Sequence, residues 1–189
     1  MHEATAERAA SGMFGWLKTR ERQILLVTAA AQLLILLGMT ALRALPLVTG
    51  QTVLVRVVPV DPRDLFRGDY VILSYDFSRT PQERIEGLSA EERGSWNRLE
   101  GRPVYVPLVR DSVPGHWRAE KVTMVKPATR PFLKGQMGRY GSLQFGIEAY
   151  YVQEGTGRRY EQAIRDRRLS AELAVTSSGQ AALKGLRIE

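Results

Sequence analysis

The stretch GDYVILSY, at residues 68–75, predicts a tight turn that leads directly into a β-strand. Gly68 can take a positive φ, and the carboxylate of Asp69 can accept hydrogen bonds from backbone N–H groups of the turn. Side chains alternate along a strand, so Tyr70 and Leu73 point to opposite faces. Because both faces are largely apolar, the pattern predicts a central strand in which both of these side chains are buried.

The rest of the chain after residue 50 predicts one β-rich domain. Short runs of Val, Leu, Ile and Tyr between turn residues indicate about eight strands, and the run at 103–110 alternates apolar side chains on one side. Ser-Gly at 178–179 predicts a hairpin close to the C-terminus. We therefore expect a mainly β fold over residues 52–189, either a sandwich or a partly open barrel.

Two or three short helices are expected to interrupt the strands. TPQE at 80–83 and SAEE at 89–92 each place a hydroxyl-bearing N-cap three residues before a glutamate, which is the capping-box pattern. The segment 156–168 predicts a third helix, with Tyr160 and Ile164 four residues apart on one face.

An apolar stretch near the N-terminus predicts a transmembrane helix. Residues 23–42, QILLVTAAAQLLILLGMTAL, carry no charge and would span about 30 Å as a helix, which matches a bilayer core. The stretch is longer than the apolar region of a signal peptide, and no clear A-x-A cleavage site precedes Arg43. We therefore expect an uncleaved single-pass anchor over residues 23–43.

Flanking charges predict the orientation of this anchor. The basic residues on its N-terminal side are Lys18, Arg20 and Arg22. The positive-inside rule then places residues 1–22 in the cytoplasm and the β-rich domain outside it. Residues 44–51 are expected to form a short tether that keeps the domain close to the lipid bilayer.

Three arginines are candidates for contacts with a partner near the membrane. Arg63 and Arg67 belong to the turn that precedes the predicted strand, and Arg130 belongs to a later loop. A guanidinium group binds carboxylates and lipid phosphates in bidentate fashion. The alternative is that these arginines brace their own turns.

Composition argues against several other classes of function. The net charge is +7, but basic residues are dispersed among carboxylates, so we expect no nucleic-acid binding. The absence of cysteine removes disulfides and thiolate sites. His116 is the one histidine in the predicted domain and has no clustered carboxylates, so we expect no metal and no cofactor. Glu154 and Glu161 can either pair across a site or remain solvated.

The turn before the predicted strand also resembles the segment that follows the nucleophile of signal peptidases. Alignment on Gly68 and Asp69 places Val60 at the position of the nucleophilic serine. A nucleophile needs a hydroxyl or similar group beside a base, and valine has none. We therefore expect no catalytic residue, with a peptidase-like membrane enzyme as the alternative.

A second resemblance covers roughly residues 24–188. The signature G-D-Y-x-x-L-x-Y is matched at every specified position, and the matching residues are Gly68, Asp69, Tyr70, Leu73 and Tyr75. A membrane segment before the signature and the segment YYVQEGTGRRYE at 150–161 are also similar to the bacterial GDYXXLXY proteins. This family has no assigned reaction. Its members tend to accompany multi-pass membrane proteins, so the resemblance implies such a partner at the bacterial inner membrane.

These observations favour a membrane-anchored protein whose exported β domain binds or stabilises a membrane or envelope partner. The five signature residues then serve a structural or a binding role. A lipid or ligand sensor is a further alternative beside the peptidase-like enzyme. A hydroxyl group and a base that meet in a cleft would favour the enzyme, whereas an exposed surface rich in tyrosine would favour binding.

Overall fold

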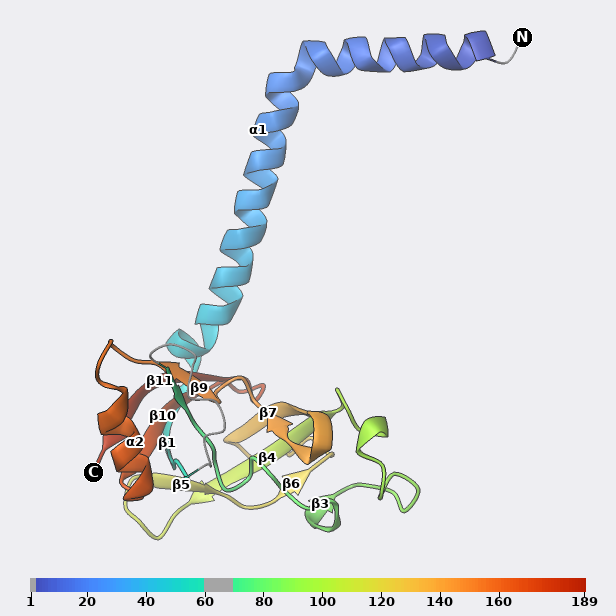
Figure 1. Cartoon of the computed structure of the whole chain (residues 1–189). Coiled ribbons are helices and arrows are strands. Elements are labelled where there is room, and N and C mark those ends of the chain that lie inside the picture. Colours follow the sequence, from blue (N-terminus) through green and yellow to red (C-terminus); the bar gives the residue numbers. More distant parts are fainter. Residues whose placement is uncertain (1–2, 60–69) are drawn as a thin grey trace. The chain divides into compact units, whose positions relative to one another are not determined.

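The computed structural model describes residues 3–59 and 70–189 of the chain (Figure 1). These residues divide into two compact units, Met1–Arg43 and Ala44–Glu189. The first unit is helical. The second unit begins with the end of the same helix and contains every strand that the structure describes, so the predicted mainly β fold with an N-terminal apolar helix is confirmed.

The N-terminal helix α1 runs over Glu3–Thr49. Its segment Arg20–Thr49 is long and apolar enough to cross a membrane, and none of the apolar window is buried within the protein. A signal sequence near an N-terminus also meets this criterion of length and composition. Most of the segment 44–51, which we expect to act as a tether, is helical, because α1 continues to Thr49.

The last turn of α1 is fixed to the β-rich unit by a proline and a glycine. Pro46 is buried, and its carbonyl accepts a hydrogen bond from the N–H of Gly50 at 2.8 Å. A Cβ atom on Gly50 would lie 2.8 Å from the nitrogen of Val175 and 2.9 Å from the carbonyl carbon of Ala174. Only a glycine therefore allows the backbone of the helix end to approach the sheet this closely.

Nine strands form a mixed sheet in the order β11-β10-β1-β5-β4-β6-β3, with β7 paired to β4 and β8 to β7. Their bounds are β1 Gln51–Arg56, β3 Ile85–Glu86, β4 Pro103–Arg110, β5 His116–Ala119, β6 Val122–Thr123, β7 Phe132–Met137, β8 Leu143–Gln144, β10 Leu169–Val175 and β11 Ala181–Ile188. Most neighbours are antiparallel, whereas β1 with β5 and β3 with β6 are parallel. A hydrogen bond from the N–H of Lys134 on β7 to the carbonyl of Gly179 joins β7 to the β10–β11 turn, at 2.7 Å.

Several predicted strands are confirmed at their positions. The apolar side of β4 is buried as its alternation predicts, and β10 and β11 form the hairpin predicted around 178–179. The described residues contain eleven strands rather than about eight. One reason is that residues 116–123 form two short strands, β5 and β6.

The strand of the signature differs from its prediction. Residues Tyr70–Ile72 form β2, which pairs with β9, Ala149–Tyr151, in a separate two-stranded ribbon. The prediction of a central strand buried on both faces is therefore wrong. The inner face packs into the core that the ribbon shares with the large sheet, through Val71 and Leu73. The outer face is open to solvent.

The helices of the β-rich unit are short. They are the 3₁₀ turns η1 Gln82–Arg84, η2 Trp96–Arg98 and η3 Arg139–Gly141, and the α-helix α2 Gly157–Arg165. The third predicted helix is confirmed as α2, with Ile164 buried and Tyr160 packed on the core.

The two predicted capping boxes form turns rather than α-helices. The hydroxyl of Thr80 donates back to the carbonyl of Phe77 instead of capping η1. The carboxylate of Glu92 does accept from the N–H of Ser89 at 2.9 Å, but the segment remains a turn.

Candidate functional site

The inner side of the signature strand belongs to the core. Leu73 and Tyr75 are each 2% exposed. The Tyr75 hydroxyl donates to the carbonyl of Ile147 at 2.9 Å, and its ring stacks on Phe77 with centroids 5.2 Å apart. Burial, and next the nearby Glu148 carboxylate, raise the pKa of the Tyr75 hydroxyl, so the phenol stays protonated. These two signature residues therefore hold the ribbon on the core.

The outer side of the same ribbon exposes apolar and aromatic side chains. Tyr70 lies opposite Tyr151, and Ile72 lies opposite Ala149, so all four share one face. Tyr151 is 83% exposed and Ile72 is 39% exposed, while Tyr70 is half-buried with its ring centroid 6.0 Å from that of Tyr151. We call these four residues the tyrosine face. The prediction that Tyr70 is buried in the core is corrected by this arrangement.

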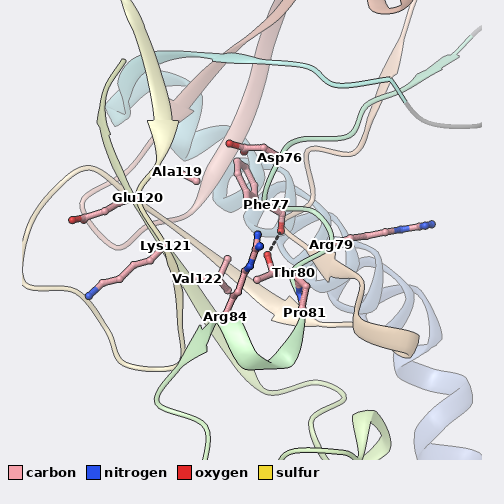
Figure 2. Close-up of a pocket in the computed structure, with 10 residues that line it drawn as sticks. All are labelled: Asp76, Phe77, Arg79, Thr80, Pro81, Arg84, Ala119, Glu120, Lys121 and Val122. Carbon is pink, nitrogen blue, oxygen red and sulfur yellow. Dashed lines mark hydrogen bonds between the residues drawn. The ribbon is translucent and has the colours of Figure 1, made fainter. Parts of the chain in front are cut away.

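A hollow of about 250 Å³ lies just beyond the end of the signature (Figure 2). Its lining residues are Asp76, Phe77, Arg79, Thr80, Pro81, Arg84, Ala119, Glu120, Lys121 and Val122. Phe77, which stacks on Tyr75, and Val122 are its buried apolar residues. The sequence alone gave no signal for this hollow, because its walls come from segments about 40 residues apart.

The charged side chains around the hollow point in different directions. Figure 2 shows the Arg84 side chain rising beside Thr80, while Arg79 and Lys121 point away to opposite sides. The ammonium of Lys121 lies 2.7 Å from the carboxylate of Glu86, and this hydrogen bond raises the pKa of Lys121. The residue Asp76 is exposed, but partial burial of its carboxyl group still raises the pKa of that group. The charges are thus not gathered into one cluster.

One hydroxyl group and one imidazole do meet, but they meet in the interior. Nε2 of His116 lies 3.1 Å from Oγ of Ser170 and 2.6 Å from Oε1 of Glu189. His116 and Ser170 are buried, and Ser170 also donates to the Glu189 carboxylate. In a catalytic triad the serine and the acid contact different ring nitrogens, whereas here both contact the same one. The cluster ties β5, β10 and the end of β11 together.

The structure places the other candidate residues as follows. Arg130 is exposed before β7, Glu154 is exposed between β9 and α2, and Glu161 is exposed on α2. None of these three lines the hollow. The candidates that lie outside the described residues are Val60, Arg63, Arg67, Gly68 and Asp69. Sequence reasoning missed the tyrosine face, although the pair Tyr150-Tyr151 was an available signal.

Comparison with known proteins identifies one family. The family model described as GDYXXLXY protein matches residues 32–186, which includes the end of the apolar helix and almost the whole β-rich unit. No curated protein and no solved structure matches the chain.

Proposed function

The chain belongs to the GDYXXLXY protein family, and on that premise we propose that its β-rich domain binds a protein embedded in the membrane to which α1 anchors it. The tyrosine face is the binding surface in this proposal. Its exposure is the observation that carries the proposal, because two signature residues build the core while the signature Tyr70 lies on the open side of the same strand.

The chemistry of the tyrosine face suits protein recognition. Tyrosine gives a large contact area for the loss of little side-chain freedom, and aromatic residues are enriched at the centres of protein interfaces. The face also has small and apolar members, Ala149 and Ile72, beside the two tyrosine rings. An apolar centre flanked by phenol hydroxyl groups can bury surface and still satisfy polar atoms of a partner.

Core packing and backbone hydrogen bonds hold the tyrosine face in place. Val71 and Leu73 anchor β2 in the core, and α2 packs against β2. The Leu73 N–H donates to the carbonyl of Glu148 at 2.8 Å, which extends the pairing of the ribbon. A surface that is ordered before binding loses less entropy on association, so the face gains affinity from this support.

A partner in the same membrane fits the length of the connection. One residue, Gly50, separates the end of α1 from β1. In Figure 1, β9 lies at the same end of the β-rich unit as the last turn of α1. A partner held in the same bilayer would be met at high effective concentration, so a modest contact area suffices for a complex.

The proposed location is the bacterial inner membrane, with the N-terminus in the cytoplasm and the domain in the periplasm. The basic residues before the span support this orientation. We propose a binding role rather than a catalytic one. The support for this is that the contact between Ser170 and His116 is buried, while the tyrosine face is open.

Site-specific photocrosslinking tests this proposal. A photoreactive phenylalanine analogue replaces Tyr151 in full-length protein expressed in bacterial cells, and the matched control replaces Tyr140, which is 91% exposed on η3. We expect position 151 to capture one specific integral membrane protein, position 140 to capture none of it, and Ile72→Ser to lower the yield at 151. Equal capture at both positions, or capture of lipid alone at 151, would contradict the proposal.

A further inference from the structure

The junction between α1 and the sheet leaves very little distance between the predicted span and the domain. Residues 44–49 belong to the β-rich unit and rise about 9 Å along their helix axis. The headgroup layer on each side of a bilayer core is about 5–8 Å thick. A span that ends at Arg43 therefore brings the start of β1 to the outer boundary of the headgroups.

The exposed side chains of this short segment are also apolar. Leu45, Leu47 and Val48 are exposed, and Val48 is 84% exposed. Large apolar side chains in continuous contact with water are unfavourable. Lipid or the apolar part of the headgroup layer would cover them, because they belong to the apolar helical segment Arg20–Thr49.

The close packing at Gly50 holds the last turn of α1 on the sheet. The Gly50 N–H bonds to the carbonyl of Pro46, and the backbone of Gly50 lies against Val175. Pro46 lacks an N–H, so the helix loses one hydrogen bond to the carbonyl of Leu42 at this point. This loss adds no length to the connection between the helix and β1.

The β10–β11 turn lies at the same end of the sheet. Gln51 pairs with Val175, and Val175 pairs with Ala181, so the turn at 176–180 extends past the start of β1. Ser177 in this turn is exposed. Lys134 of β7 lies beside it, because its N–H bonds to Gly179, and its side chain is exposed.

We propose that the β10–β11 turn and Lys134 rest on the phosphate headgroups of the membrane that α1 spans. The turn supplies the hydroxyl of the exposed Ser177, and the exposed Lys134 ammonium supplies a positive charge that attracts anionic lipid. This contact surface is separate from the tyrosine face and sets which parts of the domain face the lipid. It rests on the proposed retention of α1 as a membrane anchor.

Depth-dependent fluorescence quenching tests this contact. The sequence contains no cysteine, so Ser177→Cys and Arg187→Cys each give a single labelling site. The two sites lie toward opposite ends of the β10–β11 hairpin, about 20 Å apart along β11. Each full-length labelled protein is reconstituted in phosphatidylcholine vesicles that contain phosphatidylglycerol and a lipid with a spin label on its headgroup.

We expect quenching at position 177 to exceed quenching at position 187 several-fold. Lys134→Glu should reduce the quenching at position 177. In vesicles without phosphatidylglycerol, the quenching at 177 should differ less between Lys134→Glu and its parent. Equal quenching at 177 and 187 in protein that resists alkaline extraction would overturn the headgroup contact and leave the anchor intact. Release of the protein by alkaline extraction would overturn both the anchor and the contact.

Discussion

Tyr75→Phe removes one hydroxyl group from the core and leaves the packing of the ring unchanged. The hydroxyl donates to the carbonyl of Ile147 at 2.9 Å, and both residues are buried. Phenylalanine keeps the stack on Phe77, so the substitution creates no large cavity. The effect on the free energy of unfolding should therefore come from the lost hydrogen bond alone.

The expected loss of stability arises because the carbonyl of Ile147 stays buried without its hydrogen-bond donor. A buried acceptor that is left without its partner costs about 1–3 kcal/mol. For a domain of this size, each kcal/mol lowers Tm by about 2–4 °C, so Tyr75→Phe should melt about 2–12 °C below the parent. The exposed hydroxyl of Tyr151 gives a matched control, and Tyr151→Phe should change stability by no more than about 0.5 kcal/mol.

The same hydroxyl predicts a dependence of stability on alkaline pH. Burial raises the pKa of Tyr75 in the folded state, whereas the unfolded phenol ionises near pH 10. The stabilisation is therefore complete below about pH 10 and is lost as pH rises from there toward the folded-state pKa. The parent should lose stability above pH 10 more steeply than Tyr75→Phe does.

Thermal melts of the full-length protein in detergent measure both effects. Trp16 of α1 is replaced by phenylalanine in every protein compared, so that fluorescence of Trp96 and Trp117, which pack against the core, reports unfolding of the β-rich unit alone. If Tyr75→Phe melts with the parent while Tyr151→Phe is destabilised, the assignment of inner and outer faces to the signature strand is wrong. If the parent and Tyr75→Phe lose stability equally steeply above pH 10, the reasoning about Tyr75 ionisation is refuted.

Three further variants test other parts of the structure. Leu73→Ala should cost about 2–5 kcal/mol in chemical denaturation because it leaves a cavity in the core, and a cost below 1 kcal/mol would show an exposed side chain. Gly50→Ala should cost about 1–3 kcal/mol of unfolding free energy, because the new Cβ meets backbone atoms. The control Gly185→Ala has open space around its Cβ and should cost less. Equal losses in the two variants would refute close packing at Gly50. Backbone and side-chain hydrogen bonds from Ser89 and Arg102 lower the pKa of Glu92, so Arg102→Met should raise that pKa in an NMR titration, and an unchanged value would remove Arg102 as a cause.

The sequence predicted those parts of the fold that depend on local alternation. The strand β4 has a regular apolar alternation, and the β10–β11 hairpin has a Ser-Gly turn signal between two apolar runs. Both elements lie where the sequence predicts them. The helix α2 was predicted in the same way from the spacing of Tyr160 and Ile164. In these segments the local pattern and the tertiary packing agree, so no other interaction displaces the predicted element.

The signature strand was mispredicted because an apolar side chain does not reveal what covers it. Tyr70 and Ile72 give β2 a second apolar face, and this pattern is the same for a strand inside a sheet and for a strand with an open binding surface. Similarly, the hydroxyl of Thr80 found a nearer partner in Phe77 and so did not cap a helix. The meeting of His116 with Glu189 has no local signal, because 73 residues separate them.

The measurement that tests the central claim most directly is labelling of a single cysteine from outside intact bacterial cells. Full-length protein with Arg187→Cys is exposed to a thiol reagent that cannot cross the inner membrane, and Ser11→Cys serves as the matched site before the span. A membrane-anchored domain outside the cytoplasm predicts labelling at 187 without lysis, labelling at 11 only after lysis, and full-length protein in the membrane fraction. Labelling at 187 only after lysis, or release of a shorter fragment from the membrane, would contradict the account.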